Sequence, residues 1–161
     1  MDIALIEQVK IQAQVLVPLV KALQAELGEE RANAIVRKAL GGLYREYGQK
    51  WWRTQAAGNL GEKVASAFEM FAAGDALDYK VVKKTPDAYE INVTECRYAE
   101  FYKKIGAPEL GFLLICSGDS DFFHAEGFGA NVRLTVTQTI MQGASHCDFR
   151  WALKNEEGAV P

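Results

Sequence analysis

The amino-acid sequence predicts an α+β domain in which N-terminal helices pack on an antiparallel sheet. Up to Gly74, apolar residues recur at intervals of three and four, which is the period of amphipathic helices. From Asp78 onward, apolar and polar residues alternate in short runs, which is the period of half-buried strands. A group of helices followed by a group of strands is typical of an α+β fold.

Three long helices are expected over residues 3–27, 29 to about 52, and 59 to 73. Gly28 ends the first, because glycine is the residue that most often follows a helix C-terminus. The acidic side chains of Glu29 and Glu30 suit the positive N-terminal end of the second helix. The third starts at Asn59, whose side chain can accept from the Glu62 amide while the Glu62 side chain bonds back.

The second half of the chain predicts two hairpins with short helices between them. The first hairpin joins residues 79–83 and 89–93 through the turn Thr85-Pro86-Asp87, and the second joins residues 131–141 and 146–153 through a turn at 142–145. Between them, helices are expected over residues 97–105 and from Pro108 to Cys116. Gly118 and Gly127 bracket an acidic loop.

Composition limits the classes of partner and location. One domain is expected over residues 1–154 with a flexible C-terminal tail at 155–161, because 161 residues suffice for a single core. A net charge of −3 without a run of lysine or arginine argues against nucleic acid. No stretch reaches about 18 apolar residues, so no membrane span is expected. Three distant cysteines without a signal peptide indicate reduced thiols in the cytoplasm.

Two of the cysteines, Cys96 and Cys116, are candidates for a site in the middle of the chain. Cys96 lies where a strand passes into a helix, and the free amides of a helix N-terminus can lower the pKa of a thiol. It is therefore the candidate nucleophile, although a small buried side chain at a strand end fits equally well. Cys116 ends the apolar helix LGFLLIC, so it fits a core position or the wall of a cavity.

The last strand carries a second group of candidates. Alternation places His146, Asp148 and Arg150 on one face and Cys147 and Phe149 on the other, because successive side chains of a strand point in opposite directions. His146 is a candidate base. The residue types also fit a solvated polar face opposite a buried apolar one.

The acidic loop and the cysteines raise two further possibilities. Asp119, between serines and near a glycine, fits either a general base or an exposed turn. Zinc or another divalent metal is chemically possible, since thiolates could join His146 or His124 as ligands. No CxxC or HxxxH spacing supports such a metal site, so no cofactor is expected.

Three segments resemble the family of L-2-amino-thiazoline-4-carboxylic acid hydrolases: VTECRYAEFYKKIGAPELGFLLICSGD, AEGFG and LTVTQTIMQGASHCDFRW. The resemblance extends to the helical opening and is densest at Cys96-Arg97-Tyr98, at Cys116 with Asp119, and from Gly143 to Arg150. It implies that water opens a small heterocycle containing a C=N bond. It also implies that the three cysteines and the pair Asp148 and Arg150 line the site.

A more remote similarity links the chain to ligand-binding domains of the 4-vinyl reductase type and to TRAPP subunits. They share helices before a sheet and a final G-x-x-x-C-x-F hairpin, here Gly143, Cys147 and Phe149. The zinc sites of these sensor domains use an acid and a cysteine where this chain has Val136 and Thr139, which argues against a zinc site of that kind. The similarity also implies a pocket between helices and sheet and a helix-mediated homodimer.

Two functions follow as hypotheses. In the first, a thiolate at Cys96 attacks a cyclic amidine, amide or imide, and His146 or Asp119 relays protons. Arg150 then holds a substrate carboxylate. The expected substrate-binding residues are Tyr98, Cys116, Cys147, Asp148 and Arg150. In the second, the same pocket binds a small molecule without chemistry, as in a sensor domain.

Overall fold

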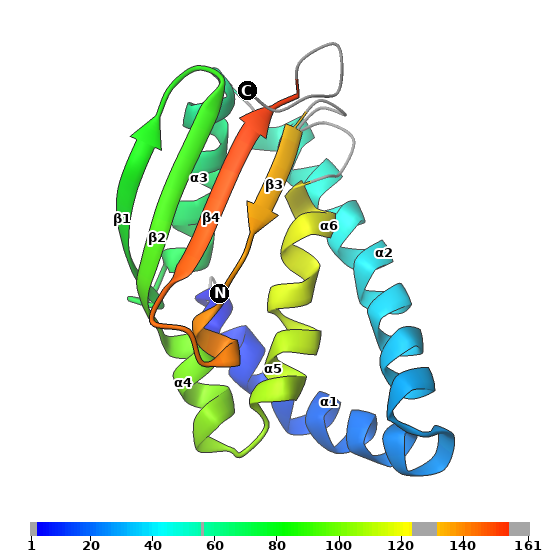
Figure 1. Ribbon diagram of the computed structural model, residues 1–161. Coiled ribbons are helices and arrows are strands. Elements are labelled where there is room, and N and C mark those ends of the chain that lie inside the picture. Colours follow the sequence, from blue (N-terminus) through cyan, green and yellow to red (C-terminus); the bar gives the residue numbers. More distant parts are fainter. Residues whose placement is uncertain (1–2, 56, 124–131, 155–161) are drawn as a thin grey trace.

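The computed structural model describes residues 3–55, 57–123 and 132–154 (Figure 1). The elements are α1 (Leu5–Leu27), α2 (Glu29–Gln55), α3 (Leu60–Ala72), β1 (Leu77–Lys84), β2 (Ala88–Cys96), α4 (Arg97–Lys104), α5 (Pro108–Leu114), the 3₁₀ turn η1 (Cys116–Gly118), α6 (Asp119–Phe123), β3 (Val132–Val136), the 3₁₀ turn η2 (Ile140–Gln142) and β4 (Cys147–Leu153). This order of elements confirms the predicted α+β class.

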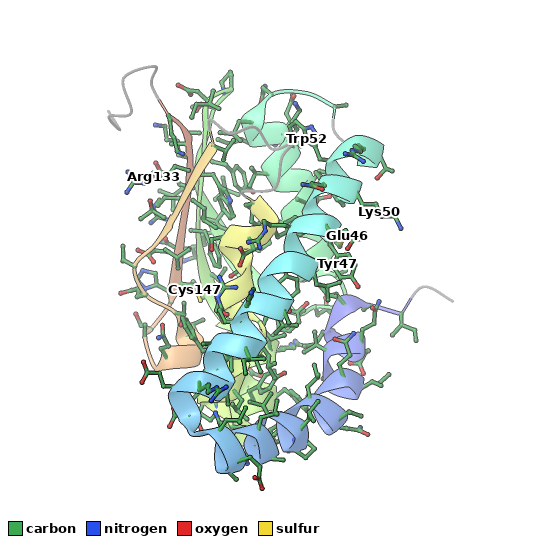
Figure 2. The ribbon with its side chains drawn as sticks, turned by 90° about the vertical axis from the view of Figure 1, so that its right-hand side faces the viewer. Glu46, Tyr47, Lys50, Trp52, Arg133 and Cys147 are labelled. Atoms are coloured by element: carbon green, nitrogen blue, oxygen red, sulfur yellow. The ribbon has the colours of Figure 1, made fainter. Side chains whose placement is uncertain are left out.

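The strands form one antiparallel sheet in the order β1-β2-β4-β3. Each predicted hairpin is present, and the two join because β2 also pairs with β4, with Ile91 opposite Phe149. The helices lie on one face of this sheet, as Figures 1 and 2 show from two directions. Strand β4 is one of the two inner strands of the sheet. Its side chains point alternately towards the helices and towards the open face.

Two predicted helix boundaries have the expected local cause. Asn59 and Glu62 form the full capping box at the start of α3, with hydrogen bonds of 3.1 and 2.9 Å. Gly28 separates α1 from α2 at a φ of 81°, a left-handed value that disfavours other residues. Both signals are local, since each depends only on residues close together in the sequence.

The second hairpin is shorter than predicted. Strand β3 ends at Val136, and the connection to β4 contains a 3₁₀ turn in place of a simple four-residue turn. The Asp148 carboxylate accepts hydrogen bonds from the backbone amides of Thr137 and Gln138 at 2.8 and 2.9 Å. Because the carboxylate takes these amides, they do not continue the ladder with β4.

The acidic segment after Gly118 was predicted as a loop, but its described part is helical. Asp121 in α6 forms ion pairs with Arg37, at 2.6 Å, and with Arg45, both on α2. Gly41 leaves room for this contact, since a Cβ there would lie 3.1 Å from the Asp121 carboxylate. These contacts hold α6 against α2. The proposed end of the loop at Gly127, together with His124, Asn131 and the tail at 155–161, lies outside the described residues.

Two clusters of buried side chains form the core. One joins α3, α6 and the inner face of the sheet around Phe68, Ile91 and Trp151, and the other joins α1, α4 and α5. No helix in the described part of the chain is long and apolar enough to cross a membrane.

Candidate functional site

A cavity of about 920 Å³ lies between the two core clusters. All three cysteines line it, and so do Tyr98 and Asp119. Most other lining side chains are aliphatic or aromatic, and they come from α1, α2, α3 and the inner face of the sheet. A large, mainly apolar cavity with a few polar groups is the usual form of a small-molecule site, for which roughly 300–1,000 Å³ is typical.

The cavity opens to solvent between α1, α2 and α3. The lining side chains of Ile11, Val15 and Tyr47 are 58%, 67% and 52% exposed, which places them at the mouth. Lys50 lies one helical turn beyond Tyr47 on α2 and is also exposed. Figure 2 shows Tyr47 and Lys50 on α2 and Cys147 on the helix side of the sheet. The helices thus form the mouth of the cavity. Strands β2 and β4 and the chain segment from α5 to α6 form its inner wall.

A second cavity, of about 380 Å³, lies on the other side of the inner wall. Cys116, Asp119 and Thr139 line both cavities, so these three residues form the wall between them. The second cavity is lined largely by hydroxyl and amide side chains, namely Ser117, Ser120, Thr137, Gln138, Thr139 and Gln142. Its donors and acceptors suit water, whereas the larger cavity suits an apolar ligand.

Asp119 is the acid of this wall. It is the first residue of α6, and its side chain is half-buried. It lines both cavities. Burial raises the pKa of its carboxyl from 3.8 to about 7, because a charge is poorly solvated there. A carboxyl group with such a pKa can both accept and donate a proton near neutral pH.

The predicted lowering of the Cys96 pKa is wrong. The thiol does cap α4, accepting a hydrogen bond from the Ala99 amide at 3.4 Å, as its position before a helix suggested. Burial nevertheless raises the pKa of Cys96 above its ordinary value of 9.0, and the bonds from the Ala99 and Tyr98 amides only partly offset this. Cys96 is therefore a neutral thiol near neutral pH.

The other two thiols are neutral for the same reason. Burial, together with the nearby Asp119 carboxylate, raises the pKa of Cys116 well above 9.0. Burial raises that of Cys147 to about 11, although the thiol accepts a hydrogen bond from the Ile140 amide at 3.2 Å. All three cysteines are free. The prediction that at least two of them reach a common pocket is confirmed.

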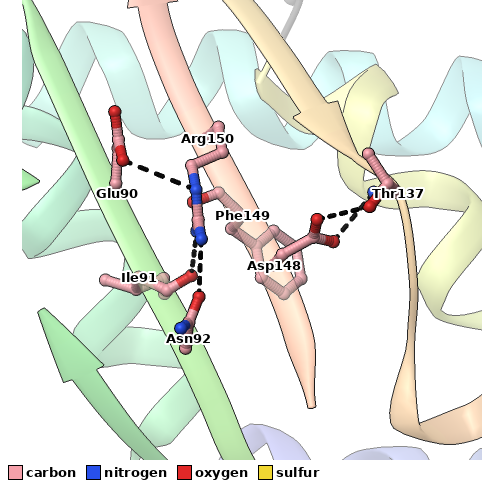
Figure 3. Close-up of polar contacts among 7 residues, drawn as sticks. All are labelled: Glu90, Ile91, Asn92, Thr137, Asp148, Phe149 and Arg150. Carbon is pink, nitrogen blue, oxygen red and sulfur yellow. Dashed lines mark hydrogen bonds and ion pairs between the residues drawn. The ribbon is translucent and has the colours of Figure 1, made fainter. Parts of the chain in front are cut away.

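Three predicted site residues, His146, Asp148 and Arg150, do not line either cavity. Arg150 bonds the Ile91 carbonyl and the Asn92 side chain, each at 2.7 Å, on the open face of the sheet (Figure 3). Burial alone would raise the pKa of Asp148. Its carboxylate accepts hydrogen bonds from the backbone amides of Thr137 and Gln138, and these bonds outweigh burial and lower the pKa. His146 contacts the side chain of Gln138. The alternation that points Cys147 into the cavity turns Asp148 and Arg150 away from it, and His146 lies just before β4.

Two tyrosines that the sequence did not single out also line the large cavity. Tyr44 on α2 donates a hydrogen bond from its hydroxyl to the Leu114 carbonyl at 2.5 Å, and its ring covers Gly118. Burial raises the pKa of Tyr102, on α4, to about 12. Both fit the apolar stripes of their helices, so no signal in the sequence separates them from core residues. Tyr98, which was predicted, donates to the Phe71 carbonyl at 2.9 Å.

Among the residues that the structure describes, no group of three or more histidine, cysteine, aspartate or glutamate side chains could hold a metal ion. The three thiols and Asp119 line the same cavity but form no such group.

The chain is similar to known proteins in fold and in family. The structure is similar to the crystal structure of the phenol-responsive sensory domain of the transcription activator PoxR with phenol, with a TM-score of 0.55 and 12% identity over 89% of this chain and 76% of that chain. At this identity the likeness shows the fold alone. The comparison with curated proteins gives no significant match. The family model of L-2-amino-thiazoline-4-carboxylic acid hydrolase matches residues 8–151, so the chain belongs to that family.

Proposed function

We propose that this protein hydrolyses a carbon–nitrogen bond in a small cyclic amidine or amide, with Asp119 as the general base. The observation that carries the proposal is the position of this carboxyl, with a pKa of about 7, in the wall between an apolar and a polar cavity. The apolar cavity suits the ring, and the polar one suits the attacking water. Family membership supports a ring-opening hydrolysis.

The proposed reaction begins when Asp119 takes a proton from water and the water oxygen bonds to the ring carbon of the C=N group. The π electrons of this group move to the ring nitrogen, and Asp119 then delivers its proton to that nitrogen. Collapse of the tetrahedral intermediate breaks the C–N bond. The remaining hydroxyl proton passes to the departing nitrogen, so the products are a carbonyl compound and an amine. A carboxyl with a pKa near the working pH suits both transfers.

The cysteines have a different role in this proposal from the one that the sequence suggested. A thiol whose pKa lies above 9.0 is almost entirely protonated at neutral pH, and the thiolate is the nucleophile in cysteine chemistry. Cys96 and Cys116 therefore act as neutral side chains that shape the cavity beside Asp119. Nucleophilic attack by Cys96 is the alternative that the experiment distinguishes.

The test compares three variants with the wild type on 2-amino-thiazoline-4-carboxylate and related small rings. Asp119→Asn should lower kcat/KM by at least about 100-fold, since general-base catalysis contributes about that much. Asp78→Asn, at an exposed position on β1, is the matched control and should leave turnover unchanged. Cys96→Ser should keep turnover within about tenfold of the wild type, as removal of a neutral wall group implies. Full activity in a folded Asp119→Asn variant would exclude this base, and complete loss in Cys96→Ser would make the thiol the nucleophile.

A second candidate function is small-molecule binding without chemistry. The observation in its favour is the likeness of the fold to a sensory domain whose crystal structure contains phenol, together with the apolar cavity. In that case no ring compound is turned over, but phenol or another aromatic compound raises Tm, because a ligand of the native state stabilises it.

A further inference from the structure

We infer that the ligand of the large cavity is a small nitrogen-containing ring with a bulky apolar, preferably aromatic, substituent and without a carboxylate on the ring. The inference rests on the proposed function for the reacting group and adds the class of substrate. It departs from the compound in the family name, which is a single ring with an amino group and a carboxylate.

The size of the cavity is the first reason. Its volume of about 920 Å³ is at the upper end of the range of roughly 300–1,000 Å³ found for sites of drug-sized ligands. One five-membered ring fills a small part of this space, so apolar walls would stay in contact with water. A substrate with a large apolar group covers these walls and removes them from water, which favours binding.

The charge of the lining is the second reason. Among the described lining residues, the acidic and basic side chains are Asp119 at the inner wall and Lys50 at the mouth, and there is no arginine or histidine. A carboxylate on a ring that reaches Asp119 would lie in an apolar cavity beside a second carboxyl group. Such a buried charge without a partner is strongly unfavourable. Arg150, the predicted carboxylate partner, lies on the open face of the sheet.

The aromatic walls are the third reason. Phe71 and Phe122 are in edge-to-face contact, with ring centroids 5.3 Å apart, and Phe68 packs against Phe149 in a similar way at 5.7 Å. All four rings line the cavity. Aromatic rings prefer edge and offset contacts with one another, so this wall offers such contacts to an aromatic substituent.

The test uses two compounds that differ at one position: 2-amino-thiazoline-4-carboxylate and 2-amino-4-phenyl-thiazoline. Calorimetry with the wild-type protein should show that the phenyl compound binds about ten- to hundredfold more tightly, as expected for a buried ring in place of a carboxylate. Equal or tighter binding of the carboxylate would overturn the inference. So would failure of the phenyl compound to bind at millimolar concentration.

A pair of variants ties this affinity to the cavity. Leu40→Trp narrows the cavity from α2, whereas Leu113→Trp adds the same side chain at an equally half-buried position that does not line it. Leu40→Trp should weaken binding of the phenyl compound at least about tenfold, because overfilled space excludes the ligand, and Leu113→Trp should leave it unchanged. Circular dichroism checks that both variants fold. If both folded variants bind like the wild type, the ligand lies elsewhere and the inference is wrong.

Failure of this inference and failure of the proposed function give different results. Tight binding of the phenyl compound without ring opening would support the proposed ligand class and contradict the proposed hydrolase activity. Ring opening with a preference for the carboxylate would support the hydrolase activity and contradict the ligand class.

Discussion

Replacement of Asp119 by asparagine tests the electrostatics of the candidate site without a substrate. Asparagine keeps the size and shape of the side chain, but it carries no ionisable group. Burial raises the carboxyl pKa from 3.8 to about 7 in the folded protein, so the folded state holds this proton more tightly than the unfolded state. The stability that this proton provides is complete below pH 3.8 and is lost as the pH rises through 7.

The size of the effect follows from this window. Between pH 5 and about 7, the unfolded state has lost the proton and the folded state has kept it, which changes the free energy of unfolding by about 1.4 kcal/mol per pH unit. Between pH 5 and pH 8, the free energy of unfolding of Asp119→Asn should therefore rise by about 3 kcal/mol relative to that of the wild type. A gain of this size is a large part of the total stability of an ordinary domain.

Urea unfolding followed by circular dichroism at pH 5 and pH 8 measures this difference directly. Other groups titrate equally in both proteins, so their contributions cancel when the variant is compared with the wild type at each pH. Asp78→Asn, at its exposed position, should show no change of this kind. If the difference between Asp119→Asn and wild type is the same at both pH values, the carboxyl is solvated in the folded protein, and its assignment as a base near neutral pH loses its physical ground.

Three other predictions follow from the same structure. The kcat/KM for ring opening should rise with pH and level off above about 7, because Asp119 must be ionised to act as a base, and a flat profile from pH 5 to 8 would contradict this. Gly118→Ala should cost about 1–3 kcal/mol in urea unfolding, since its Cβ would lie 2.1 Å from the Tyr44 ring. Gly42→Ala, whose Cβ meets nothing within 4 Å, is the control and should not destabilise. Sedimentation should give about twice the chain mass of 17.8 kDa, because Leu19, which does not line the cavity, is an apolar side chain 51% exposed on α1, and Leu19→Asp should give the monomer; a wild-type monomer at micromolar concentration would exclude the dimer.

Local signals in the sequence predicted the elements well. The capping pair Asn59 and Glu62 is complete in the structure, because it depends on residues three apart and on nothing else. The alternation of the last strand also holds, with Cys147 and Phe149 buried and Asp148 and Arg150 partly exposed. The second hairpin was predicted too long because the side chain of Asp148, on the partner strand β4, accepts hydrogen bonds from the amides after Val136.

The candidate site depended on both levels. The amino-acid sequence predicted which residues carry reactive groups and that helices precede an antiparallel sheet. The family resemblance implied that the three cysteines line the site, but it grouped them with Asp148 and Arg150, which do not line either cavity. Alternation predicted the buried face of the last strand, and the packing of the helices on that face decides which of its side chains border a cavity. This packing places Cys147 in the cavity and His146 and Arg150 outside it. Only the tertiary structure decided the protonation of Cys96 and Asp119, because burial sets these pKa values and depends on residues from every part of the chain.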